Sequence, residues 1–191
     1  MKKYLQDLEN DPSLIHDSYF MSSLSKFSML PYAIIEKYAD FVDWYEICLY
    51  RHMSIDFMEK MNKYLRFEII SYCQRLTEKF IEKYRDKLEW SSVCGNQKLS
   101  EKFLLEHFED IVLEPLLYNK KAEITDNFWR TLFTYNDSIE VNGRWMPNNF
   151  CKPFSVNLIR EFRNKFKYLN GKMINSRDQK LWKELRIANW N

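Results

Sequence analysis

The side chains with the most reactive chemistry in this chain are its cysteines and histidines. Cys48, Cys73, Cys94 and Cys151 are widely spaced, whereas a zinc site needs close ligand pairs such as two cysteines separated by two residues. Cys48 and Cys94 occupy the same position of a repeated segment, which favours small core residues over metal ligands. His107 falls on an apolar stripe, where a packed, hydrogen-bonded histidine is favoured over a ligand or a base. No metal and no other cofactor is expected.

Groups that could support nucleotide or covalent catalysis are also sparse. The 3 glycines are isolated from one another, so no glycine-rich loop can cradle a phosphate. Three glutamates, Glu36, Glu59 and Glu82, are each followed by lysine, as on a solvated helix face. A nucleophile and base brought together from distant positions stays possible in principle, but no pattern favours one. The chain is expected not to be an enzyme.

A basic segment near the end of the sequence offers binding chemistry instead. Between Arg160 and Arg186 lie nine basic residues and three acidic ones, a local charge of +6 in a chain of +2. The segment could bind a phosphate backbone, with Tyr168 and Trp182 stacking on bases. The favoured alternative is an amphipathic helix that caps the core with its lysine stems. The candidate partner-binding residues are Arg160, Arg163, Lys167, Lys172, Lys180 and Lys183.

A second candidate surface lies just before this segment. Residues 138–146 contain Asn142-Gly143 between alternating apolar residues, which predicts a small β-hairpin insertion because both turn positions favour positive φ. Such a finger would present Arg144 and Trp145 to a partner. The favoured alternative is that the hairpin covers the open end of a helical stack.

A segment repeated about every 23 residues must position these groups. Copies begin at Leu30, Met53, Leu76 and Leu99, and further copies at Ile124 and Phe154 follow at wider spacings. In five copies the next residue can cap a helix through its hydroxyl group, namely Ser54, Thr77, Ser100, Thr125 and Ser155. The residue before each cap is apolar, and a second apolar residue lies five positions further along the chain, as Ile81 does after Leu76. Such a pair is a hydrophobic staple.

The apolar positions after each cap predict two helices per copy. Phe57, Phe80, Phe103 and Phe128 begin a buried stripe that continues through Met61 and Leu65 and their equivalents, which predicts a first helix of about three turns. A second, shorter helix is expected from Trp44, Phe67 and Trp90. Pro31 replaces the cap of the first copy, so its helix is expected to begin out of register. One copy cannot bury its own aromatic face, so stacking on neighbours must supply the core.

Composition agrees with this interpretation. The 191 residues are 46% hydrophobic and 17% aromatic, with only 3 Gly and 5 Pro, which points to helices rather than a β-sandwich. No apolar run is long enough for a membrane span or a secretory signal, and the scattered cysteines indicate a reducing cytoplasm. The fold is expected to be all-α, with the helical hairpins stacked as a short α-solenoid. An N-terminal cap (1–20) would precede the repeat array (21–135), and the insertion, the last repeat helix and a basic cap (136–191) would complete a single domain.

One copy also carries a known motif. Trp90, Val93, Gln97, Leu99-Ser100-Glu101 and Phe103-Leu104 resemble the tandem Trp-x-x-Ile and Gln-x-Leu-Ser-Glu-x-Phe-Ile repeats in proteins of phages and large DNA viruses. The resemblance covers about residues 21–133 and is best over 67–111, departing at Leu113-Glu114-Pro115 and after Tyr135. It implies a viral origin and an interaction role.

Two functions are therefore expected. The first is a non-enzymatic, phage-like module that binds a host or viral protein in the host cytoplasm. In one form of this hypothesis, the module inhibits a host defence complex. The alternative is a nucleic-acid-binding regulator that uses the basic segment 160–186. The sequence does not decide the oligomeric state.

Overall fold

The structure is a computed structural model, and it describes residues 1–135, 141–142, 156–161 and 166–167. The described residues are mostly helical, as expected for an all-α protein. The chain divides into two compact units. Unit 1 comprises Met1–Lys98 and Asp110–Lys121, and unit 2 comprises Leu99–Glu109 and Ala122–Asn191. The predicted boundaries at residues 20 and 135 remain predictions.

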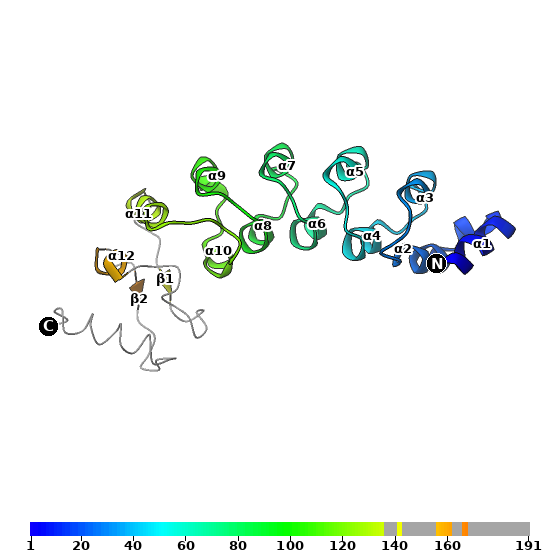
Figure 1. Cartoon of the computed structure of the whole chain (residues 1–191), viewed down its shortest axis with the longest axis horizontal. Coiled ribbons are helices and arrows are strands. Elements are labelled where there is room, and N and C mark those ends of the chain that lie inside the picture. The colour runs from blue at the N-terminus through cyan, green and yellow to red at the C-terminus, as the bar shows by residue number, and fades with distance from the viewer. Residues whose placement is uncertain (136–140, 143–155, 162–165, 168–191) are drawn as a thin grey trace. The chain divides into compact units, whose positions relative to one another are not determined.

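Unit 1 is a succession of short helices arranged in pairs. They are α1 (Lys2–Asn10), η1 (Pro12–His16), α2 (Ser18–Ser25), α3 (Tyr32–Lys37), α4 (Trp44–Tyr50), α5 (Ile55–Lys60), α6 (Phe67–Cys73), α7 (Glu78–Lys83), α8 (Trp90–Asn96) and α10 (Leu113–Tyr118). In Figure 1, α3, α5 and α7 form one row, and α4, α6, α8 and α10 form a second row. Within the second row, α4 packs on α6, α6 on α8 and α8 on α10.

The first helix of each pair begins where its cap residue predicts. The hydroxyl oxygens of Ser54 and Thr77 accept hydrogen bonds from the backbone N–H groups of Phe57 and Phe80, at 3.2 Å in each case. This bond satisfies one of the N–H groups that a helix start leaves without an internal partner. Pro31 caps α3 without a side-chain bond. Its φ of −58° and ψ of 140° nevertheless give the extended geometry that a cap needs, so α3 begins in register with α5, contrary to the expectation.

The first helices are shorter than the sequence predicts. α5 and α7 have six residues each, and α4, α6 and α8 have seven. The first helices end at Met61 and Tyr84, whose ψ values of 17° and 26° are not helical. The apolar period continues into the turn that follows, where Leu65 and Leu88 are buried although they are not helical. The predicted three-turn helix is therefore wrong: part of the stripe belongs to the turn.

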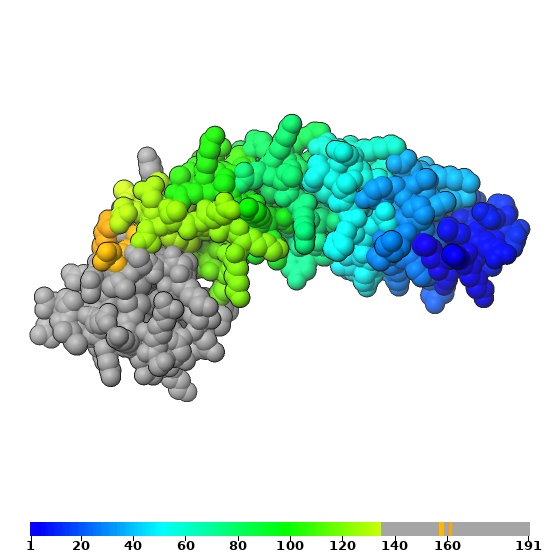
Figure 2. All heavy atoms as spheres, in the orientation of Figure 1, coloured from blue at the N-terminus to red at the C-terminus, as the bar shows by residue number. Residues whose placement is uncertain are grey.

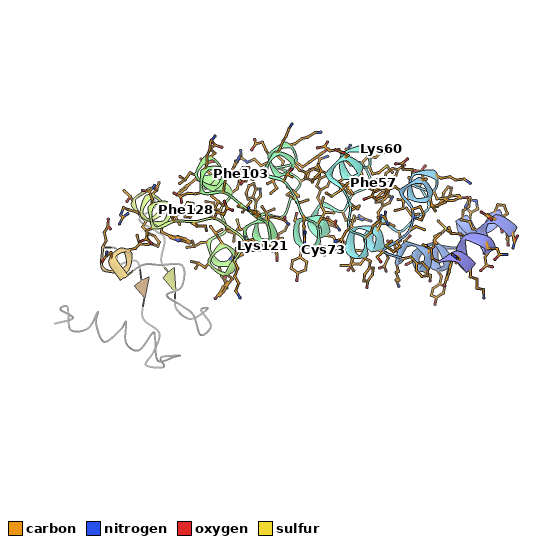
Figure 3. The ribbon with its side chains drawn as sticks, in the orientation of Figure 1. Phe57, Lys60, Cys73, Phe103, Lys121 and Phe128 are labelled. Atoms are coloured by element: carbon orange, nitrogen blue, oxygen red, sulfur yellow. The ribbon has the colours of Figure 1, made fainter. Side chains whose placement is uncertain are left out.

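The core of unit 1 lies between its two rows. Phe57, Met58, Phe80 and Ile81 of the first row are buried, as are Ile47 and Ile70 of the second. Figure 3 shows Phe57 directed between the rows and Lys60 on the outer side of α5. Side chains fill the space that separates the ribbons (Figure 2). The predicted apolar stripe is therefore buried in unit 1, whereas the stacking of the pairs as a solenoid stays a prediction.

Unit 2 contains α9 (Glu101–Glu106), α11 (Asp126–Tyr135), β1 (Val141–Asn142), α12 (Val156–Glu161) and β2 (Phe166–Lys167), with part of η2 (Phe108–Asp110) at its edge. Phe128, Trp129 and Phe133 of α11 are buried, as are Phe103 of α9 and Leu158 of α12. The starts of α11 and α12 agree with the expected caps at Thr125 and Ser155, although Ser155 lies outside the described residues.

The predicted β-hairpin over 138–146 is not confirmed. Only Val141 and Asn142 of this segment are described, and they form a strand that pairs in parallel with Phe166 and Lys167. A hairpin turn at Asn142-Gly143 would instead join two antiparallel strands. Asn142, expected at the turn, lies in the extended strand.

Candidate interaction surface

The residues predicted to bind a partner fall at the end of the chain that the structure describes least. Arg144, Trp145, Arg163, Lys172, Lys180 and Lys183 lie outside the described residues. Arg160 lies in α12 and Lys167 in β2, without described side chains. Both the finger and the basic segment therefore stay predictions, and the candidate surface must be built from unit 1.

Buried glutamines join two of the helix pairs of unit 1 to the pairs before them. The Gln74 side chain is 4% exposed, and its Oε1 accepts the N–H of Met53 at 3.0 Å. Its Nε2 donates to the carbonyl oxygens of Cys48 and Arg51, both at 2.8 Å. One side chain thus fixes the end of α4 and the start of the loop that leads to α5. We call this arrangement the glutamine clamp.

The clamp recurs one repeat later. Gln97 accepts the N–H of Leu76 at 3.0 Å and donates to the carbonyls of Ser71 and Gln74 at 2.8 and 2.9 Å. Asn119 holds the next position, where its Nδ2 donates to the carbonyls of Cys94 and Gln97. These bonds satisfy carbonyl groups that the ends of α4, α6 and α8 would otherwise leave without partners.

A second set of hydrogen bonds also links successive repeats, and we call it the Ser/Cys ladder. It is formed by small side chains at one position of successive repeats, Ser25, Cys48, Ser71 and Cys94. Each accepts the backbone N–H at the start of the next helix in the second row: Asp43 at 2.9 Å, Arg66 at 3.5 Å, Glu89 at 3.0 Å and Val112 at 3.4 Å. A thiol at 3.5 Å is a weak acceptor, so the serine steps hold the stronger bonds.

This ladder accounts for Cys48 and Cys94. Cys48 and Cys94 are fully buried, and burial raises the pKa of each thiol to about 11. A thiol with so high a pKa holds little thiolate near neutral pH and is a poor nucleophile or ligand. Their interpretation as core residues is confirmed, and the structure adds that they accept hydrogen bonds between repeats.

The acidic residues of the first row are engaged in contacts between neighbouring helices. Glu36 of α3 pairs with Lys60 of α5 at 2.7 Å. Glu59 accepts hydrogen bonds from Lys83 and from the Tyr84 hydroxyl, and the Lys83 bond lowers the pKa of its carboxyl. Carboxylates held by cations are stabilised as anions and are poor general acids. Within the described part of the chain, no group of His, Cys, Asp and Glu is arranged to hold a metal ion.

The second row carries a set of exposed aromatic side chains that the sequence analysis did not identify. Tyr45 and Tyr50 of α4, Tyr72 of α6 and Tyr118 of α10 are 53%, 50%, 64% and 40% exposed. We call these four residues the tyrosine face. A signal for it exists: Tyr72 follows the buried Ile70 by two residues, as Tyr118 follows Leu116. Two residues turn a helix by about 200°, so both tyrosines lie opposite the core.

The close packing of α8 on α10 depends on a small residue. A Cβ atom added at Gly95 would lie 3.1 Å from the Cβ of Pro115. Pro115 is the third residue of α10, where its missing N–H would have no partner within the helix. The departure from the motif at Leu113-Glu114-Pro115 therefore leaves the second helix of this repeat in place.

The comparisons with known proteins do not name a family for this chain. No protein-family model, no curated protein and no solved structure matches it. The resemblance to viral tandem repeats thus rests on the motif around Trp90 alone. In the part of the chain that is described, no helix is both long and apolar enough to cross a bilayer.

Proposed function

We propose that the protein is a non-enzymatic protein-interaction module whose repeats stack as a short α-solenoid. The observation that carries the proposal is the tyrosine face of the second row. Tyrosine is enriched at the energetically important centres of protein interfaces, because it brings a large rigid ring and a polar hydroxyl group. The four side chains lie on α4, α6 and α10 of one row, and exposed aromatic rings gathered on one row are typical of an interaction surface.

The interlocked repeats support the same function. The glutamine clamp and the Ser/Cys ladder fix each pair of unit 1 to its neighbour, so the tyrosines are presented on rigid elements. A preorganised surface loses less conformational entropy on binding than a mobile one. The proposal extends to the setting that the motif implies, a viral protein in the host cytoplasm that blocks a host defence complex.

Affinity capture from infected cells tests this proposal. The tagged full chain is compared with a Tyr72→Ser/Tyr118→Ser variant and with a Lys79→Ser control on the first row, and captured proteins are identified with and without nuclease. We expect one protein to be retained by the native chain and the control, lost by the double variant and resistant to nuclease. No such protein, or capture that ignores the two tyrosines, refutes the proposal.

The nuclease arm also tests the alternative, a nucleic-acid-binding regulator that uses residues 160–186. Capture that disappears on nuclease treatment and on reversal of Arg160, Arg163 and Lys167 to Glu would favour that alternative. Capture that survives both changes would exclude it as the main function.

A further inference from the structure

The chemistry of the partner can be inferred from the residue that follows each clamp. The clamp residues Gln74 and Gln97 have extended backbones, with φ near −90° and ψ of 159° and 156°. Successive side chains of an extended segment point to opposite sides. The clamp side chain turns into the core, so the next side chain must turn to solvent.

The outward positions after the clamp residues are basic, and the equivalent position one repeat earlier, after the extended Arg51, carries an imidazole side chain. They are His52, Arg75, Lys98 and Lys120, all exposed, and we call them the basic stripe. Lys121 follows directly, is also exposed, and donates from its Nζ to the carbonyl of Asn96 at 2.7 Å. All of these residues belong to unit 1.

Attraction to the helix dipole does not by itself account for the stripe. Cations are favoured at helix C-termini, chiefly through the unpaired carbonyls of the last turn. At the ends of α4, α6 and α8, however, clamp amides already donate to such carbonyls, as Gln74 does to Cys48 and Arg51. The carbonyls at these ends are therefore already engaged by the clamp amides, and Lys121 adds a bond to the carbonyl of Asn96.

The stripe lies beside the tyrosine face. Tyr50 is the last residue of α4 and His52 follows it by two positions, Tyr72 precedes Arg75 by three, and Tyr118 precedes Lys120 by two. Each tyrosine-bearing helix end thus offers an exposed ring and a basic or imidazole side chain together. Rings and cations so placed suit a chain with both carboxylates and apolar groups.

The charge balance favours a polypeptide over a nucleic acid. The residues of unit 1 include 16 Lys and Arg and 17 Asp and Glu, a net charge of −1. Nucleic-acid affinity is dominated by dense contacts to phosphates. Unit 1 has no overall positive charge and only one stripe residue per repeat, so it lacks such contacts. The segment 160–186 is itself basic, so it is not an occupant that the stripe would attract.

The spacing of the stripe specifies the partner further. Packed helices lie about 8–10 Å apart, so successive stripe residues recur at about that distance. A polypeptide in the extended polyproline II conformation advances about 3.1 Å per residue with three residues per turn, so every third side chain returns to the same face about 9 Å further on. We propose, on the basis of the proposed function, that the basic stripe and tyrosine face bind an extended acidic segment of the partner with Asp or Glu at about every third position.

Fluorescence anisotropy with the full chain tests this inference. The probes are a labelled peptide with Glu at every third position, a peptide of the same composition with its glutamates clustered, and a single-stranded oligothymidylate. We expect the periodic peptide to bind most tightly, and the Arg75→Glu/Lys120→Glu variant to lose at least about tenfold in affinity. A Lys37→Glu/Lys79→Glu control makes the same charge change at exposed positions of the first row and should change affinity less than about twofold.

Three results would overturn the inference. They are equal affinity for the clustered peptide, periodic-peptide binding that ignores the stripe variant, and tighter binding of the oligothymidylate that the stripe variant abolishes. Unchanged urea midpoints confirm that the variants are folded. Affinity capture separates failure of this inference from failure of the proposed function. If a partner is lost with Tyr72→Ser/Tyr118→Ser but kept with Arg75→Glu/Lys120→Glu, the inference fails and the proposed function stands. If the native chain captures no partner, the proposed function itself is refuted.

Discussion

Replacing Gln97 by methionine should show how strongly each repeat depends on the next. Methionine has a similar length and no branch, so the variant fills the same space without the amide. The change removes three hydrogen bonds, one to the N–H of Leu76 and two to the carbonyls of Ser71 and Gln74. The Gln97 side chain is only 3% exposed, so water cannot easily replace those bonds.

The expected cost follows from these losses. A buried N–H left without a partner costs about 1–3 kcal/mol, and each lost bond to a carbonyl about 0.5–1.5 kcal/mol. Burial of the methionine thioether offsets about 1 kcal/mol of the total. The free energy of unfolding should therefore fall by about 1–5 kcal/mol, compared with the 5–15 kcal/mol of an ordinary domain.

Urea unfolding followed by circular dichroism measures this change. With a slope near 2 kcal/mol/M, the midpoint should move down by about 0.5–2.5 M. Gln6→Met is the matched control, because Gln6 is exposed on α1 and the same substitution should cost less than about 0.5 kcal/mol there. A Gln97→Met variant as stable as this control would refute the clamp as a link between repeats.

Further predictions concern the ladder and the close packing of α8. Ser71→Ala should lower the free energy of unfolding, measured in urea, by about 1–2 kcal/mol. Ser71→Cys should lower it less, because Cys48 and Cys94 accept the same bond at the equivalent positions. Equal losses for the two variants would contradict this role. The pKa of each of these two thiols is about 11 rather than 9.0, so the unfolded chain loses protons first and stability should fall as pH rises from about 9 to about 11. That decline should be smaller in Cys48→Ala, and an identical pH profile would argue against the shift. Gly95→Leu should cost about 1–3 kcal/mol because its side chain meets Pro115, and a neutral result would mean that α10 shifts freely.

Local signals in the sequence predicted the helix starts well. Ser54, Thr77 and Ser100 cap helices as expected, because a cap and a staple depend on a few adjacent residues. The ends were harder to predict. Apolar spacing continues past Tyr84 although the helix stops there, because the turn after each first helix contributes to the same core.

The surface of unit 1 could not be predicted in the same way. Hydrophobic periodicity treats Gln74 and Gln97 as polar and hence outside, whereas their amides are buried because backbone groups of the previous repeat need partners. Helical spacing does hold a signal for Tyr72, which lies two residues and about 200° from the buried Ile70, but it cannot show that the exposed rings gather on one row. The finger at Arg144 and the basic segment remain predictions from sequence.

The most direct test of neighbour dependence is residue-resolved amide hydrogen exchange of the native chain and the Gln97→Met variant. Gln97 holds the N–H of Leu76, and Gln74 holds that of Met53 one repeat earlier. We predict that the exchange of Leu76 accelerates by more than tenfold in the variant while that of Met53 accelerates far less. Unchanged exchange at Leu76, or equal acceleration at both amides, would contradict an architecture in which each repeat is held by its immediate neighbour.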